Sequence, residues 1–184
     1  RHSGEPTLLA GHIASADRVL IPEVPVDLDH FSDLIISDRE KNPNNYAIAV
    51  VAEGVTVKDG ENIYQGKKDH YGNDKLGGIG DVIYNDLRAN HHVSVLTQPL
   101  AYLLRSGEPD ALDKLAATSF GTMAIQMIEQ KNYGKMTAIV DGNYAVTNNN
   151  CVLSEQTTPL VSNLYDAKNY RPEIKNILGR PMYL

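Results

Sequence analysis

The chain has 184 residues, a length that suits one globular domain or two small domains closely joined. Hydrophobic residues make up 42% and charged residues 22%, which is enough apolar material for a core of ordinary size. The net charge of −6 argues against a general nucleic-acid surface, because a phosphate backbone requires a basic face. We therefore expect any bound anion to be small and held by a few placed cations.

The single cysteine, Cys151, excludes an internal disulfide and a cysteine-based zinc site, and it fits a reducing cytoplasm. No apolar run approaches the length that crosses a membrane. The chain begins on Arg1 rather than on methionine, which favours a fragment or a processed chain.

The first elements alternate between helix and strand. Apolar and small residues at helical spacing predict a helix over residues 7–16, after the helix-starting residues Ser3 and Pro6. A short buried strand is expected at Val19–Ile21, where Pro22 stops it.

Residues 27–42 predict an amphipathic helix with acids in its first turn. Residues 46–54 ("YAIAVVAEG") predict the clearest strand, continuous and β-branched as a parallel strand covered on both faces should be. The polar residues 56–75 indicate a surface loop or a β-excursion. A glycine turn then opens a helix within residues 76–91, and "HVSVL", residues 92–96, predicts another strand.

The second half of the chain predicts a long helix from Asp110 to about Gln130 and a strand pair around Asp141-Gly142. The tail is expected to contain a short helix near "LYDAKNY" and an extended end, "LGRPMYL". The expected buried stripe of the long helix is Leu112, Leu115, Ala116, Phe120, Met123 and Met127.

This alternation favours an α/β fold of three layers, with a mainly parallel sheet flanked by helices. Ligands of such folds collect where loops leave the carboxyl ends of strands, and Glu23 and Glu53 fall at two such ends. Glu53 closes a run of mostly apolar residues. It is either a structural acid capping a neighbouring loop or an acceptor for ligand hydroxyls.

The tetrapeptide "SGEP" occurs twice, and an arginine stands just ahead of it each time, Arg1 and Arg105. A guanidinium beside a helix N-terminus makes a good phosphate or carboxylate pocket, since both supply donors to one anion. The alternative is a surface arginine or a structural ion pair. Arg105 follows the apolar "LAYLL", so we expect its stem to be partly buried.

Other chemical signals are weak. The turn "LGGIGD" resembles a phosphate cradle, but it matches neither the Walker pattern nor a full dinucleotide fingerprint, and a tight turn explains it equally well. The histidines lack metal-binding spacing, and His91 and His92 would point to opposite faces of the predicted strand. Cys151 has no neighbouring histidine, so nucleophilic catalysis has no support. The residues by themselves indicate an α/β domain suited to a phosphorylated polyol or sugar.

Several segments, in their order along nearly the whole chain, resemble the C-terminal half of a phosphofructokinase. They are "RHSG", which begins at the arginine of the family's Met-Gly-Arg loop, "ADRVLIPEVPVDLDHF", "AIAVVAEG", "DKLGGIGDVI", "AYLLRSGEPDALDKLAA" and "KMTAIVDG". The resemblance implies that Arg1 lies against the transferring phosphoryl group and the sugar phosphate. It further implies that Glu53 accepts hydrogen bonds from fructose hydroxyls and that Arg105 clamps the 6-phosphate.

The sequence departs from the family at two places. Tyr102 replaces the usual histidine three residues before Arg105, and its phenol would serve as a hydrogen-bond donor to the phosphosugar. Asparagines in "NPNNY" replace the basic residues that bacterial members use for an allosteric nucleotide. Glu23 belongs to a segment that the resemblance marks as a fold feature rather than a site.

The resemblance implies a sugar-phosphate-binding domain over residues 1–104, a segment 105–150 that returns to a donor-binding domain, and a tail 151–184 that packs back. The phosphoryl donor, ATP or pyrophosphate, and the Mg²⁺ site would belong to an N-terminal half that this sequence lacks. We therefore expect these residues to be inactive alone, as part of a cytoplasmic, homo-oligomeric 6-phosphofructokinase acting on fructose 6-phosphate. The alternatives are a non-catalytic phosphosugar-binding or regulatory subunit and a degenerate scaffold subunit.

Overall fold

The computed structural model describes residues 3–58, 64–68, 74–76, 78–100, 103–149 and 163–173. The chain divides into two compact units. Unit 1 comprises residues 1–98 and 157–177, and unit 2 comprises residues 99–156 and 178–184.

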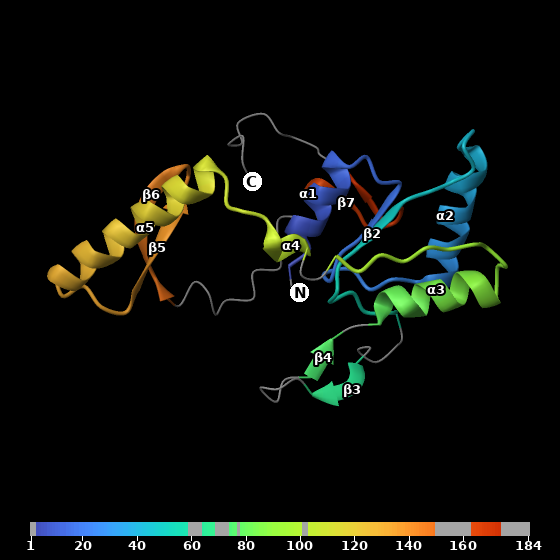
Figure 1. Cartoon of the computed structure of the whole chain (residues 1–184), viewed down its shortest axis with the longest axis horizontal. Coiled ribbons are helices and arrows are strands. Elements are labelled where there is room, and N and C mark those ends of the chain that lie inside the picture. Colours follow the sequence, from blue (N-terminus) through green and yellow to red (C-terminus); the bar gives the residue numbers. More distant parts are fainter. Residues whose placement is uncertain are drawn as a thin grey trace. The chain divides into compact units, whose positions relative to one another are not determined.

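Unit 1 is built around a pair of parallel strands, β1 (Arg18–Leu20) and β2 (Ala49–Val51) (Figure 1). The helices of this unit are α1 (Glu5–Ile13), α2 (Leu28–Lys41) and α3 (Ile79–Ala89). Two antiparallel pairs complete its described strands: β3 (Tyr64–Lys68) with β4 (Asp74–Leu76), and β7 (Tyr165–Asp166) with β8 (Arg171–Pro172).

Strand β1 is buried on both faces, as a parallel strand between helices should be. The Val19 side chain packs so closely on Gly11 of α1 that a Cβ at Gly11 would collide with it. The preceding residue, Arg18, reaches Asp38 of α2 instead. Successive side chains of a strand point to opposite faces. Helices α1 and α2 therefore cover opposite faces of β1, which makes the predicted three-layer α/β arrangement. Parallel pairing among the described residues is limited to β1 with β2 and one bridge between Val26 and Val57.

The buried apolar side chains of the described residues form one cluster, and every member belongs to unit 1. The cluster includes residues of α1, α2 and α3, of β1 and of the turn after β2, together with residues of the C-terminal segment 163–173. Its members are Leu8, Val19, Leu20, Ile21, Val26, Phe31, Ile35, Ala52, Val55, Ile79, Ile83, Leu87, Leu164, Tyr165 and Tyr170.

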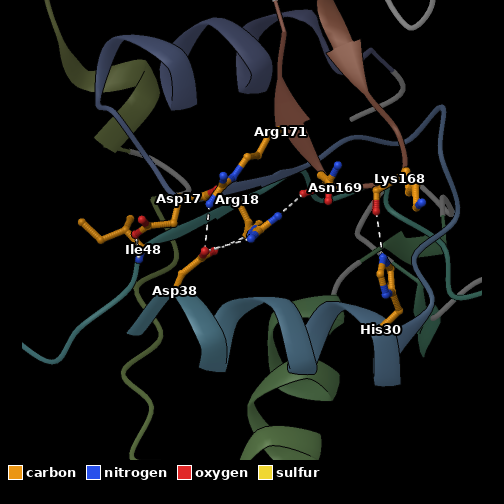
Figure 2. Close-up of polar contacts among 8 residues, drawn as sticks. All are labelled: Asp17, Arg18, His30, Asp38, Ile48, Lys168, Asn169 and Arg171. Atoms are coloured by element: carbon orange, nitrogen blue, oxygen red, sulfur yellow. Dashed lines mark hydrogen bonds and ion pairs between the residues drawn. The ribbon is translucent and has the colours of Figure 1, made fainter. Parts of the chain in front are cut away.

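A buried ion pair crosses from the sheet to α2 (Figure 2). Arg18 donates from Nε to Asp38 Oδ2 at 2.5 Å and from Nη2 to Asp38 Oδ1 at 2.9 Å, and its Nη1 donates to the Asn169 carbonyl at 2.5 Å. Arg171 donates from Nη2 to the same Asp38 at 2.8 Å. Arg18 is 4% exposed and Asp38 9%. One carboxylate thus joins β1, α2 and the C-terminal segment.

The C-terminal segment, residues 163–173, covers the edge of β1 that faces away from β2. The Val19 backbone N–H donates to the Tyr170 carbonyl at 2.8 Å, and the Tyr165 hydroxyl donates to the Val19 carbonyl at 2.5 Å. The Tyr170 hydroxyl accepts from the Asp27 backbone N–H at 2.9 Å. A ring nitrogen of His30 lies 2.8 Å from the Lys168 carbonyl (Figure 2). The described tail is therefore a structural part of unit 1.

Unit 2 contains α4 (Leu103–Ser106), α5 (Ala111–Glu129) and the antiparallel strands β5 (Lys135–Val140) and β6 (Asn143–Asn148). The predicted turn at Asp141-Gly142 is present. Both residues have positive φ, 50° and 78°, as the tight turn of a hairpin requires. The long helix is present too, and Phe120 of α5 meets Tyr144 of β6 edge to face with ring centroids 5.8 Å apart.

The predicted strand at residues 92–96 is wrong. This segment is extended but pairs with no described strand, although burial alternates along it. His92 has a positive φ of 54°, which interrupts an extended backbone at the first predicted residue. The Val93 backbone N–H donates to the Leu87 carbonyl, so the chain turns back on the end of α3.

Two further predictions are corrected. The α5 stripe is not buried: Ala116, Phe120, Met123 and Met127 are half-buried, whereas Leu112 and Leu115 are exposed. The hairpin alone is too small to cover a helix of this length. Near "LYDAKNY" the described residues 163 and 164 are helical, but the rest of this segment forms the β7–β8 hairpin, because Asp166 accepts from the backbone N–H groups of Lys168 and Asn169 and forms a turn there. The segment "LGRPMYL" lies outside the described residues.

We predict that Asp38→Ala lowers the free energy of unfolding of the chain by about 3–5 kcal/mol, because it leaves the buried Arg18 without its carboxylate. Asp33→Ala is the matched control, since Asp33 is an exposed acid on the same helix and should change stability by less than about 0.5 kcal/mol. Urea unfolding followed by circular dichroism measures both values. Equal losses for the two variants would contradict the structural role of the pair.

Candidate functional site

The carboxyl edge of the β1–β2 pair gathers the acids that the sequence singled out. The strands are parallel, with Leu20 opposite Val51. Glu23 follows Leu20 by three residues, and Glu53 follows Val51 by two. Both glutamates therefore leave the sheet at the same edge, where ligands of open α/β sheets bind.

Glu23 binds the start of α1. Its Oε1 accepts from the Gly4 backbone N–H at 2.7 Å, across 19 residues of sequence. Gly4 is the N-cap of α1 and makes no side-chain cap of its own. A Cβ at Gly4 would lie 2.5 Å from Ile21 Cβ and closer still to Glu23 Oε2, so only glycine fits. The start of α1 is thereby held at the carboxyl edge of the sheet.

Glu53 lies in the turn that follows β2, and its side chain is exposed. The turn is closed by a hydrogen bond from the Val55 backbone N–H to the Ala52 carbonyl. Ala52 and Val55 are both buried, which fixes the turn on the core while Glu53 faces outward. The side chain of Glu53 is therefore accessible from solvent at the carboxyl edge of the sheet.

The other predicted site residues are placed only in part. Arg1 and Tyr102 lie outside the described residues. Arg105 belongs to the short helix α4 of unit 2, and its side chain is not described. Among the four predicted residues, Glu53 is therefore the one whose side chain the structure describes. The structure also describes Gly4, which lies three residues after Arg1.

The expected anion pocket at the helix starts is not supported. At α1 the Glu23 carboxylate already takes the Gly4 N–H. At α5 the Asp110 carboxylate accepts from the Asp113 N–H at 2.9 Å, and the Asp113 side chain accepts in return from the Asp110 N–H. Carboxylates thus use these donors and oppose a second anion. The N–H groups of Gly4, Asp110 and Asp113 are therefore already used by carboxylates of the chain.

Two other sequence features have conformational explanations. Gly78 of "LGGIGD" is the N-cap of α3 with a φ of 107°, a conformation that requires glycine. His91 follows α3 in a turn, with its Nε2 3.7 Å from Asp86 Oδ2, and the same Asp86 oxygen accepts from the Ser32 hydroxyl at 2.8 Å. The acid therefore joins α3 to α2.

Two groups in unit 1 have shifted pKa values. Burial, with the neighbouring Tyr170, raises the pKa of the Tyr165 hydroxyl well above its usual value, so that it stays a donor to Val19. The backbone N–H of His30 lowers the pKa of Asp27, which caps α2.

The described residues contain no group of three or more histidines, cysteines and acids arranged to hold a metal ion. None of the helices in this part of the chain has the length and apolar character needed to span a bilayer.

The structure resembles that of phosphofructokinase from Pichia pastoris, solved in its T-state, with a TM-score of 0.61 over 80% of this chain and 15% of that chain. The identity in this comparison is 21%, so it establishes the fold alone. The α/β class expected from the sequence is thereby confirmed.

Residues 1–128 match the family model described as Phosphofructokinase. The ATP-dependent 6-phosphofructokinase 3 of Streptomyces coelicolor is 33% identical over 140 residues, which cover 76% of this chain and 41% of that protein. The pyrophosphate–fructose 6-phosphate 1-phosphotransferase of Thermoproteus tenax is 30% identical, over 79% of this chain and 41% of that protein. The chain belongs to the phosphofructokinase family, and it spans about two fifths of the length of these relatives.

The sequence did not reveal the role of Glu23, which it marked as a fold feature. The available signal was the start of α1 itself, where Gly4 offers no capping side chain and Pro6 offers no N–H. A helix that begins this way needs a cap from elsewhere, but its source is visible only in three dimensions.

We predict that Gly4→Ala destabilises the chain by about 1–3 kcal/mol, because the added methyl group collides with Glu23 and Ile21. Gly80→Ala is the control. Gly80 lies in α3 with nothing within 4 Å of an added Cβ, so alanine should stabilise the chain by up to about 1 kcal/mol. Thermal unfolding measures both changes, and a neutral Gly4→Ala would contradict the close approach.

Proposed function

We propose that the chain is the sugar-phosphate-binding, C-terminal part of a 6-phosphofructokinase, which phosphorylates fructose 6-phosphate to fructose 1,6-bisphosphate in cytoplasmic glycolysis. The observation that carries the proposal is the family match over residues 1–128, together with relatives of both donor types of which the matched region covers 41%. ATP or pyrophosphate would be the donor, since relatives named for each match this chain.

Four residues of the chain would bind the acceptor sugar in this proposal. Glu53 would accept hydrogen bonds from fructose hydroxyls, which its exposed position after β2 permits. Arg1 would stabilise the charge of the transferring phosphoryl group. Arg105 and Tyr102 would bind the 6-phosphate, the arginine through charge-assisted hydrogen bonds and the tyrosine through its hydroxyl.

The donor and the metal would be bound by the missing part of the enzyme. Mg²⁺ would neutralise charge on the donor phosphates, but the described residues offer no ligand group for it. The function proposed for this chain is therefore to bind and orient the acceptor sugar.

The exposed apolar side chains of unit 2 favour packing against a further part of the protein. None of the described α5 residues is buried, and apolar side chains lie on opposite sides of the helix. Ile125 is 58% exposed and lies nine residues, or about 2.5 turns, beyond the half-buried Ala116. A helix that is apolar all round is buried in the complete protein. We infer that α5 and the β5–β6 hairpin, within segment 105–150, pack on the donor-binding half.

The competing proposal is a non-catalytic phosphosugar-binding or regulatory subunit that has only the acceptor site. The chain spans only part of the length of the curated relatives, which favours this proposal as much as the first one. The two proposals differ in whether a donor-binding half restores turnover. In either case we propose a homo-oligomer, dimer or tetramer.

We predict that the 184-residue chain alone forms no fructose 1,6-bisphosphate from fructose 6-phosphate with Mg²⁺ and either ATP or pyrophosphate. Adding a polypeptide with the remaining three fifths of the family's length should restore turnover. A coupled aldolase assay measures the product. Turnover by the chain alone would contradict the proposal, and binding of fructose 6-phosphate without restored turnover would favour the regulatory subunit.

We predict that Ile125→Gln weakens association with the donor-binding half at least about tenfold, because it places an amide in an apolar interface. The stability of the chain itself should change by less than about 0.5 kcal/mol, since Ile125 is exposed there. Glu129→Gln, an exposed neighbour on α5, is the control. Analytical ultracentrifugation measures association, and unchanged association of Ile125→Gln would exclude this face as the interface.

A further inference from the structure

The extended residues 93–96 leave the end of α3 without joining a sheet. The Val93 backbone N–H donates to the Leu87 carbonyl at 3.0 Å. Beyond Val93, the backbone groups of Ser94, Val95 and Leu96 make no hydrogen bond to any other described residue. Backbone groups of an extended chain beside a core are normally paired in a sheet. This segment therefore has the backbone of a strand and lacks the neighbour of one.

The side chains of this segment also behave as those of a strand. Val95 is half-buried and packs against the core cluster of unit 1, whereas Ser94 and Leu96 are exposed. This alternation is the two-residue period of a strand with one face on a core. Leu96 is 94% exposed, although its neighbour in sequence lies against the core. The outer face of the segment therefore presents a large apolar side chain that no described residue covers.

The direction of the backbone groups identifies the open edge. In an extended chain, the N–H and C=O groups of alternate residues point to the same edge. Because the Val93 N–H points back to the end of α3, the groups of Ser94 and Leu96 point to the opposite edge. Natural edge strands avoid pairing with the help of lysine, proline or charged side chains, and residues 93–96 ("VSVL") contain none of these. This edge is therefore suited to accept a further strand.

The length of the relatives and the state of unit 2 favour one occupant for this edge. The matched region covers 41% of relatives of both donor types, so their remaining length includes a large further body of protein. Unit 2, which begins at residue 99, has exposed apolar side chains on α5, such as Leu115 and Ile125. The residues on both sides of the boundary between the units thus lack cover. A second copy of the chain would bring a second uncovered α5, whereas the further body would supply cover to each part.

We propose that a β-strand of the donor-binding half pairs with the backbone of Ser94 and Leu96 and that the same half covers the Leu96 side chain. This inference rests on the proposed function, in which that half belongs to the complete enzyme. Residues 93–96 become a strand of a shared sheet on assembly. The alternating sequence of this segment then predicts a strand that needs a partner from outside the 184 residues.

Amide hydrogen exchange followed by NMR tests the pairing. The 184-residue chain is measured alone and with the polypeptide that carries the remaining three fifths of the family's length. The amides of Ser94 and Leu96 should exchange at least about 100-fold more slowly in the complex, because strand pairing protects them. The Val95 amide, which points to the other edge, should change less. Unchanged exchange of Ser94 and Leu96 in the complex would overturn the inference. Protection that rises with the concentration of the chain alone would also overturn it, because the occupant would then be a second copy.

Two substitutions at one position separate the backbone from the side chain. Ser94→Pro removes one N–H donor from the open edge, and proline and the residue before it both favour an extended backbone. It should weaken association with the donor-binding half at least about tenfold, whereas Ser94→Ala, which keeps the N–H, should associate as the wild type does. Analytical ultracentrifugation measures both variants. Equal association of the two would overturn the inference alone. Absence of association by the wild-type chain would overturn the proposed function, and the inference with it.

Discussion

The arrangement of unit 1 depends on the buried pairing of Arg18 with Asp38. A guanidinium and a carboxylate removed from water are tolerated only when their hydrogen-bonding groups find partners, and here Asp38 accepts from both Arg18 and Arg171 while Arg18 also donates to Asn169. The pair fixes α2 on one face of β1, and the close contact of Val19 with Gly11 fixes α1 on the other. Together they hold the end of β1, and hence Glu23, in a defined place.

Much of this fold could be predicted from periodicity. The helices α2, α3 and α5 and the hairpin at Asp141-Gly142 have local patterns strong enough to decide their structure, and their order carried the family resemblance. The prediction of a strand at residues 92–96 was wrong because alternation of apolar residues indicates an extended chain but not a hydrogen-bonding partner. Asp38 looked like one of several acids on an amphipathic helix, since its importance comes from Arg18, 20 residues earlier, and Arg171, 133 residues later.

The candidate site was predictable to a similar degree. The sequence placed Glu53 where a strand leaves the core, and the residue lies in the turn after β2, because strand polarity alone decides that position. The anion pockets predicted at the helix N-termini show a physical limit of the sequence. The same N–H groups that suit a phosphate also suit a carboxylate of the chain, and the sequence does not tell which one occupies them. Unit 2, with its exposed apolar helix, contains Arg105 and has no buried core among its described residues.

The central claim of the proposed function is that this chain binds the acceptor sugar, with Arg105 as a main phosphate ligand. Isothermal titration with fructose 6-phosphate tests it most directly, comparing the wild-type chain with Arg105→Ala and with Arg88→Ala, which removes an arginine from the surface of α3. The account predicts saturable binding that is lost in Arg105→Ala and kept in Arg88→Ala. Equal binding by all three proteins, or no binding by the wild-type chain, would contradict it.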